Sequence, residues 1–269
     1  MSKPVISLVV NCDNREGYLL PNSQVGDFGG GSLQGVRSKD LLTEGMKNKI
    51  KYFEGYPVQC IMYIDVHSPL PKDLHEEIKE IVFSCGNDSK IILAPHSKER
   101  YKWNDWLYIE AMKHADGDYV VHFDMDSNAY KKEGSDIVER YFKWLETYKY
   151  VCQPWDGIGD DMYWASTRFT ICKKETAHNP AIPQAVFTNP LLGKHNPCYE
   201  HATGILVGRD KILYPPREDD EYMIFCWANY FSGLLKHLNS LPYEKVKEYI
   251  LGCGLVGTHD IITKPITNE

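Results

Sequence analysis

Four short apolar runs alternate with segments of helical periodicity in the first half of the chain. The runs have the length and β-branched content of strands buried on both faces of a sheet, and they cover Val5–Val10, Val58–Val66, Lys90–Ala94 and Tyr119–Phe123. Between them, apolar residues recur at helical spacing over Leu41–Phe53, Leu74–Phe83 and Trp103–His114. This order predicts an α/β fold in which a mostly parallel central sheet is flanked by helices.

The second half of the chain has a weaker pattern. The predicted elements are helices over Ile137–Tyr148, from about Asp219 to Leu238 and over Tyr243–Leu251, and short strands near Met162–Ile171. The sequence contains no linker, internal repeat or low-complexity segment. We therefore expect a single domain, with residues 1–130 and 131–269 as its two halves.

Composition argues against several classes of protein. Over 269 residues the formal net charge is −7 and the sequence pI is about 5.8, which argues against a general nucleic-acid binder. The eight cysteines show no CxxC pair and no zinc-finger spacing, as expected of reduced thiols in a cytoplasmic protein. The first residues lack the features of a signal peptide, and no apolar stretch reaches the length of a membrane span. A peripheral membrane contact stays open.

Polar residues follow three of the predicted strands where each strand ends, at Asn11–Arg15, Asp65–Ser68 and Asp124–Asn128. Ligands of open parallel sheets bind outside the carboxyl ends of the strands, so these segments are expected to share one binding edge. Asp124 and Asp126 are two residues apart, which places both carboxylates on one side of an extended chain. Two carboxylates suit Mg²⁺ or Mn²⁺ bridging a diphosphate, and an acidic turn without a ligand is the alternative.

These segments resemble the GT-A nucleotide-diphospho-sugar glycosyltransferases, especially the family-two group. Asn14-Arg15 keeps the end of the family's Pro-Thr-Tyr-Asn-Arg segment, and Asp65 stands where the family's second strand ends in an acidic pair. The segment from Ala115 to Tyr119, Ala-Asp-Gly-Asp-Tyr, matches the turn before the family's Asp-x-Asp strand. The resemblance covers about residues 4–128 and implies a GT-A, Rossmann-like fold with a smaller acceptor-binding half.

The resemblance also implies roles for individual residues in donor binding. Asn11, Asp13 and Asp65 would line the nucleoside pocket, and a turn rich in Asn and Asp is the alternative for the segment after the first strand. Arg100 or Lys102 would approach the base or the phosphates. These residues follow three different predicted strands, so the predicted pocket depends on the sheet bringing them together.

The metal site that the resemblance implies has two or three ligands. Asp126 would bind the metal directly, and Asp124 would contact the metal, a metal-bound water or the ribose. His259, in a glycine-flanked C-terminal segment, is the candidate third ligand, because imidazole suits Mn²⁺ better than Mg²⁺. A histidine without a metal is the alternative for this position.

An acidic segment in the second half is the candidate for the general base. Glu218 and Asp219 match a Glu-Asp pair that the family places at the start of a helix, which makes Asp219 the predicted base with Glu218 beside it. The alternative is an acidic run that only complements the dipole of the predicted helix. His201 lies where the family's acceptor loop precedes a strand and is a candidate contact for the acceptor or a phosphate.

Together these features imply a metal-dependent transfer of a sugar from a nucleoside-diphosphate sugar, expected to be a UDP-sugar, to a hydroxyl of a glycan or other acceptor. Residues 1–130 would bind the nucleotide sugar, and 131–269 would bind the acceptor and carry catalysis. Inversion is preferred and retention is left open. One alternative is a sugar nucleotidyltransferase, although the glycine cluster Gly29–Gly35 lies far from the first strand. The other is a non-catalytic module that binds nucleotide sugars or glycans.

Overall fold

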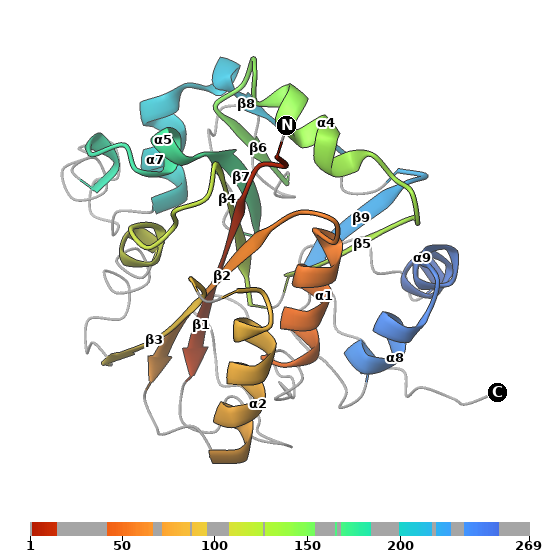
Figure 1. The fold of residues 1–269 in the computed structure, drawn as a ribbon. Helices are drawn as coiled ribbons and strands as arrows, with labels where there is room; N and C mark the ends of the chain where they lie inside the picture. Colours follow the sequence, from red (N-terminus) through yellow and green to blue (C-terminus); the bar gives the residue numbers. More distant parts are fainter. Residues whose placement is uncertain are drawn as a thin grey trace, which may run out of the picture.

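The computed structural model of the chain describes residues 2–14, 42–66, 72–86, 88–95, 108–125, 127–153, 165, 168–183, 199–216, 219–226 and 234–252. Within these residues the chain forms one large sheet, one two-stranded sheet and helices on both faces of the large sheet (Figure 1). None of the helices in this part of the chain is long and apolar enough to cross a bilayer.

The large sheet has the strand order β3-β2-β1-β4-β7-β6-β8. In that order its strands are Lys90–Pro95, Val58–Val66, Ile6–Asn14, Tyr119–Asp124, Phe169–Lys173, Tyr150–Cys152 and Ile212–Leu213. β1 pairs in parallel with β2 and β4, β2 pairs in parallel with β3, and β6 pairs in parallel with β8. β7 runs antiparallel to both of its neighbours. The predicted mostly parallel sheet is confirmed, and strands from the second half of the chain complete it.

The four strands predicted in the first half are all found. β1, β2 and β4 are buried on both faces, whereas the edge strand β3 is partly exposed, with Leu93 at 47%. In β1, Ile6, Leu8 and Val10 pack on one face and Val9 packs on the other, all of them fully buried. A strand buried on both sides must be apolar at consecutive positions, which produces an uninterrupted apolar run in the sequence. β2 occupies the predicted range from Val58 to Val66.

Helices cover both faces of the large sheet (Figure 1). One face packs against α1 (Glu44–Tyr52), α2 (Lys72–Phe83) and α4 (Ile137–Trp144), and the same core includes residues of α8 (Leu234–Ser240) and α9 (Tyr243–Gly252). The other face packs against the helical residues 108–112 and α5 (Lys174–Ala177), while α7 (Tyr199–Val207) packs against residues 108–112. The helices predicted over 41–53, 74–83, 137–148 and 243–251 are therefore confirmed, with shifted ends.

A second, two-stranded sheet follows the large sheet directly. Its strands are β5 (Ser127–Lys131) and β9 (Tyr222–Cys226), which pair antiparallel from Ser127 opposite Cys226 to Lys131 opposite Tyr222. The prediction of one helix from Asp219 to Leu238 is therefore wrong. Tyr222 to Phe225 are all buried, and an apolar stretch paired with a neighbouring strand satisfies its backbone in the sheet. The described part of helix α8 covers Leu234–Ser240.

The Ala-Asp-Gly-Asp turn fixes the amino ends of β1 and β4 to each other. Asp118 Oδ2 accepts the backbone N–H of Val5 at 2.8 Å, and the backbone N–H of Gly117 donates to Ser7 Oγ at 2.7 Å. A Cβ on residue 117 would lie 2.7 Å from the Val5 carbonyl oxygen and 2.8 Å from the Ser7 nitrogen. Only glycine allows this approach without displacing β1. The turn therefore has a structural role at the amino edge of the sheet.

Candidate functional site

The register of the sheet brings three of the predicted strand ends to one edge. Asn11 of β1 is paired with Tyr63 of β2 on one side and with Asp124 of β4 on the other. Two residues further along, Asp13 is paired with Asp65. The backbone positions of these four predicted site residues are therefore neighbours, as expected of the carboxyl edge of a parallel sheet. The side chains of Asp13 and Asp65 lie outside what the structure describes.

Asn11 is a buried amide at this edge. Only 8% of the residue is exposed, and neither Oδ1 nor Nδ2 has a hydrogen-bond partner among the described residues. An unsatisfied buried polar group costs about 1–3 kcal/mol, so folded proteins keep few of them without a reason. At the ligand-binding edge of a parallel sheet, an amide that lacks a partner within the described part of the chain indicates a ligand that supplies one.

Asp124 lies at the end of β4 and is held by a tyrosine. The hydroxyl of Tyr108 donates to Asp124 Oδ1 at 2.9 Å. The ring of Tyr108 packs edge-on against His122, with centroids 4.7 Å apart, and stacks on Tyr199 at 5.5 Å. Neighbouring rings on both sides leave Tyr108 little rotational freedom, so the Asp124 carboxylate receives a fixed hydrogen-bond donor. Sequence reasoning missed Tyr108, because nothing in its local pattern distinguishes it from a helix residue that packs in the core.

The segment after Asp124 is fixed by side chains of α1. Lys49 is fully buried, and its ammonium donates to the carbonyl oxygen of Met125 at 3.1 Å. Asn48 is 4% exposed, and its Oδ1 accepts the backbone N–H of Ala129 at 2.9 Å. The Nδ2 of Asn48 donates to Asn239 of α8 at 3.3 Å. Sequence reasoning missed Lys49 and Asn48 as well, because their role appears only when α1 packs beside the β4–β5 connection.

The described donors fit a hard divalent cation in type but do not complete its site. Asp124 supplies a carboxylate at the ligand edge, which is the ligand class that Mg²⁺ and Mn²⁺ prefer. No group of three His, Cys, Asp or Glu side chains that could hold a metal occurs within the described residues. The other predicted ligands, Asp126 and His259, lie outside the described residues, as do Arg100, Lys102, Glu218 and the side chain of His201.

Asp219 is in a turn, and the helix that was predicted to begin there is absent. Its Oδ1 accepts the backbone N–H groups of Glu221 at 2.7 Å and Tyr222 at 3.0 Å. The guanidinium of Arg140 on α4 lies 3.4 Å from Asp219 Oδ2 and 3.0 Å from Glu221 Oε2. Burial alone would lower the pKa of Arg140, but the charges of Asp219 and Glu221 raise it. These contacts stabilise the entry into β9.

Asp219 and Asp124 lie at opposite ends of the small sheet. Asp219 precedes Tyr222, which pairs with Lys131, whereas the Asp124–Asp126 segment precedes Ser127 at the other end of β5. Four residue steps of about 3.3 Å separate the two ends by roughly 13 Å. The described contacts therefore favour a structural role for Asp219. Its assignment as general base stays a prediction.

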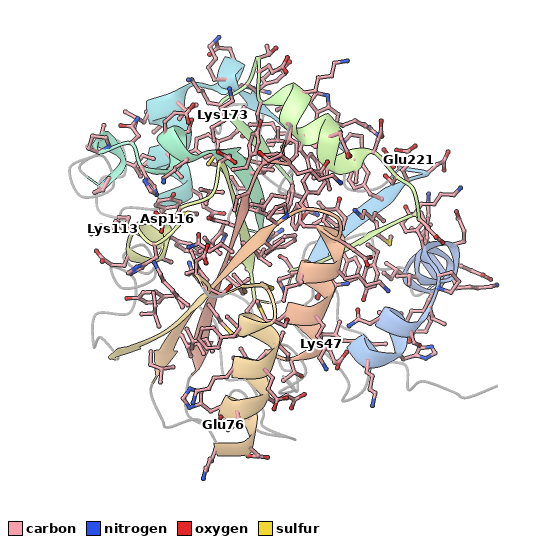
Figure 2. The ribbon with its side chains drawn as sticks, in the orientation of Figure 1. Lys47, Glu76, Lys113, Asp116, Lys173 and Glu221 are labelled. Atoms are coloured by element: carbon pink, nitrogen blue, oxygen red, sulfur yellow. The ribbon has the colours of Figure 1, made fainter. Side chains whose placement is uncertain are left out.

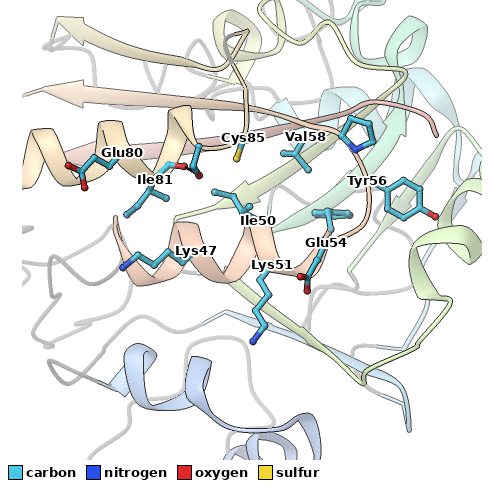
Figure 3. Close-up of a pocket in the computed structure, with 12 residues that line it drawn as sticks. Lys47, Ile50, Lys51, Glu54, Tyr56, Val58, Glu80, Ile81 and Cys85 are labelled. Carbon is cyan, nitrogen blue, oxygen red and sulfur yellow. Dashed lines mark hydrogen bonds between the residues drawn. The ribbon is translucent and has the colours of Figure 1, made fainter. Parts of the chain in front are cut away.

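A cavity of about 630 Å³ lies away from this edge (Figure 3). It is lined by the C-terminal halves of α1 and α2 and by Pro57 and Val58, where β2 begins. The floor is apolar, with Ile50 and Ile81, and Lys47 stands at its rim (Figure 3). Because β1 and β2 are parallel, the start of β2 and the end that carries Asp65 are opposite edges of the sheet. The cavity is thus separate from the candidate site.

No protein-family model and no curated protein matches the sequence. Solved structures do resemble the chain. The mannosyltransferase PcManGT from Pyrobaculum calidifontis, in complex with GDP-Man and Mn²⁺, is 15% identical, with 80% of this chain and 55% of that chain covered and a TM-score of 0.43. S. aureus TarS 1–349 in complex with UDP-GlcNAc is 13% identical, with 93% and 64% covered and a TM-score of 0.42.

A nucleoside-diphosphate-sugar pyrophosphorylase from Vibrio cholerae RC9 is 14% identical, with 80% of this chain and 93% of that chain covered and a TM-score of 0.44. The chain spans about half the length of the mannosyltransferase it resembles. The similar structures thus include a mannosyltransferase in complex with GDP-Man and a complex with UDP-GlcNAc. They also include a pyrophosphorylase, so at these identities and TM-scores no activity follows from the likeness.

Proposed function

We propose that the protein is a metal-dependent glycosyltransferase that transfers a sugar from a nucleoside-diphosphate sugar, specifically a UDP-sugar, to an acceptor hydroxyl. The observation that carries the proposal is the buried Asn11 amide, which has no partner among the described residues and is paired in register with Asp124. An amide offers one acceptor and two donors, which match the polar edge of a nucleobase or the hydroxyls of a ribose. Asp124 and Asp126 then supply carboxylates next to the nucleoside.

The chain's own residues divide the work of binding the donor. Asn11, with Asp13 and Asp65 beside it in register, would hold the nucleoside, and Arg100 would approach the phosphates. Asp124 and Asp126 would hold a divalent cation, with His259 as the third ligand. The cation would offset the charge of the leaving diphosphate when bound. Tyr108, which donates to Asp124 Oδ1, would keep that carboxylate in one orientation.

The proposed transfer also requires a general base. An inverting transfer needs an acceptor for the hydroxyl proton, and Asp219 with Glu218 is the pair predicted from the sequence. The contacts of Asp219 with two backbone N–H groups and with Arg140 support a structural role instead. A substitution of Asp219 whose effects on stability and on turnover are both measured separates these two roles.

We also propose a cytoplasmic location, and the free thiols of Cys60, Cys85, Cys152 and Cys172 agree with it.

The test is to incubate the protein with a panel of nucleotide sugars and Mn²⁺ and to identify the products by mass spectrometry. A glycosyltransferase slowly releases a nucleoside diphosphate and free sugar even without an acceptor. A second incubation with a nucleoside triphosphate and a sugar phosphate tests for a nucleotidyltransferase, which would form a nucleotide sugar and pyrophosphate. Absence of both reactions, together with saturable binding of a nucleotide sugar, would leave a binding module. The Asp126→Ala variant is the matched control, because it should lose the metal-dependent part of UDP binding.

A further inference from the structure

The ammonium group of Lys49 is enclosed by the protein. Lys49 is 0% exposed, and its Nζ donates to the carbonyl oxygens of Met125 at 3.1 Å and Gly45 at 3.3 Å. Nζ also lies 5.8 Å from the centroid of the Phe123 ring. The side chain therefore runs from α1 to the point where β4 ends and the small sheet begins.

A charged side chain is unusual at this position of the core. Removing an ammonium from water costs several kcal/mol, which its contacts inside the protein must offset. Met46 on α1 and Phe53 directly after it, which face the same core, are apolar. Replacing a buried charge by an apolar side chain of similar size is often neutral or stabilising. Core-facing positions of a helix normally carry apolar side chains, and exceptions to this pattern concentrate at functional sites.

The contact with Met125 lies in the middle of the Asp-Met-Asp segment. Met125 is itself 5% exposed, so its side chain anchors the turn while Lys49 holds its carbonyl oxygen. That carbonyl belongs to the peptide unit that joins Met125 to the next residue, so the hydrogen bond restrains the backbone directly after Met125. Tyr108 holds Asp124 through its side chain at the other end of the same segment.

We propose that Lys49 is a positioning residue of the metal- and diphosphate-binding turn. By fixing the Met125 carbonyl, it holds the backbone directly after Asp124 in one conformation, and it brings a positive charge to Met125, which lies between two aspartates in the sequence. The inference rests on the proposed function, because it assigns the turn to a metal and a diphosphate. It adds a residue of α1, more than 70 positions before the turn in the sequence.

The test compares Lys49→Met with Lys47→Met, which makes the same substitution on the same helix. Lys47 is labelled in Figure 2. Its side chain is 47% exposed and pairs with Glu44 at 2.7 Å. Mn²⁺ affinity is measured in the presence of UDP by electron paramagnetic resonance, which detects free Mn²⁺ and needs no turnover. Thermal unfolding without metal or UDP is measured in parallel. Residues that orient metal ligands typically change metal affinity by about 10–100-fold, and we expect a tenfold loss for Lys49→Met and none for Lys47→Met.

A third variant separates the loss of the hydrogen bond to Met125 from a general loss of folding. Lys49→Gln keeps an N–H donor for the Met125 carbonyl without the charge, so part of the lost Mn²⁺ affinity should return. Wild-type Mn²⁺ affinity in a folded Lys49→Met or Lys49→Gln protein would overturn the inference. Loss of cooperative unfolding in both variants would also overturn it, because Lys49 would then be a folding requirement. If the unaltered protein fails to bind Mn²⁺ with UDP, the proposed function itself fails, and the role of Lys49 fails with it.

Discussion

Replacing Asn11 by leucine should make the protein more stable and its nucleotide binding weaker. Leucine has a similar size, and it removes two polar atoms that have no partner among the described residues at a position that is 8% exposed. One unsatisfied buried group costs about 1–3 kcal/mol, so the unliganded Asn11→Leu protein should gain roughly that amount. In a domain of this size, 1 kcal/mol shifts Tm by about 2–4 °C, which predicts a rise of roughly 2–12 °C.

The same substitution should weaken UDP binding. Leucine cannot form the hydrogen bonds that the Asn11 amide would make with the nucleoside, so polar atoms of the bound nucleoside would lose their partners. Losing one or two hydrogen bonds at about 0.5–1.5 kcal/mol each predicts up to a 100-fold rise in Kd, since 1.4 kcal/mol corresponds to a factor of ten. Differential scanning fluorimetry without ligand and calorimetric titration of UDP with Mn²⁺ measure the two effects.

Asn48→Leu is the matched control for this experiment. Asn48 is also a buried asparagine, 4% exposed, but its amide is paired with Ala129 and Asn239. The same substitution should therefore lower Tm at position 48 and raise it at position 11. An Asn11→Leu protein that is less stable than its parent and binds UDP equally well would refute the reasoning, because Asn11 would then be a structural amide.

Three further substitutions test other contacts. Tyr108→Phe removes the donor to Asp124 Oδ1 but keeps the ring contacts, so metal affinity measured with UDP should fall about tenfold while Tm changes little; equal affinity would contradict the positioning role. Gly117→Ala places a Cβ 2.7 Å from the Val5 oxygen and should lower the free energy of unfolding by about 1–3 kcal/mol in urea, with unchanged UDP affinity of the folded protein. Asp219→Asn breaks an ion pair with Arg140 whose side chains are 30% and 34% exposed, and it should cost up to about 1 kcal/mol of stability with near-normal turnover. A loss of about 10²-fold or more in turnover at unchanged stability would instead establish Asp219 as the general base.

The large sheet was predictable because its central strands appear in the sequence as uninterrupted apolar runs. β2 is buried on both faces, and its predicted and observed ranges agree at both ends. The failure between Asp219 and Leu238 has the opposite cause. An acidic run before an apolar segment has the local chemistry of a helix start, but the pairing of β9 with β5 decides its conformation. That pairing joins residues almost 100 positions apart, and no local pattern contains it.

The candidate site shows the same division. Asn11 and Asp124 were predictable because residues that end parallel strands must meet at one edge, and the register makes them direct neighbours. Lys49 and Tyr108 were not predictable, because each looks like an ordinary helix residue until its helix is placed beside the end of β4. Sequence patterns thus identify side chains at strand ends, whereas the side chains that orient them follow only from the packing of helices.

The turn at Gly117 separates the assembly of the sheet from the candidate site. Its glycine and its Asp118 carboxylate contact the backbone of Val5 and Ser7 at the amino edge, at the opposite end of β1 from Asn11 and Asp124. The turn therefore determines how two strands are joined, and it lies away from the edge that is proposed to bind a ligand. Side chains at the carboxyl edge can change without altering this joint, so the fold does not by itself fix what is bound there.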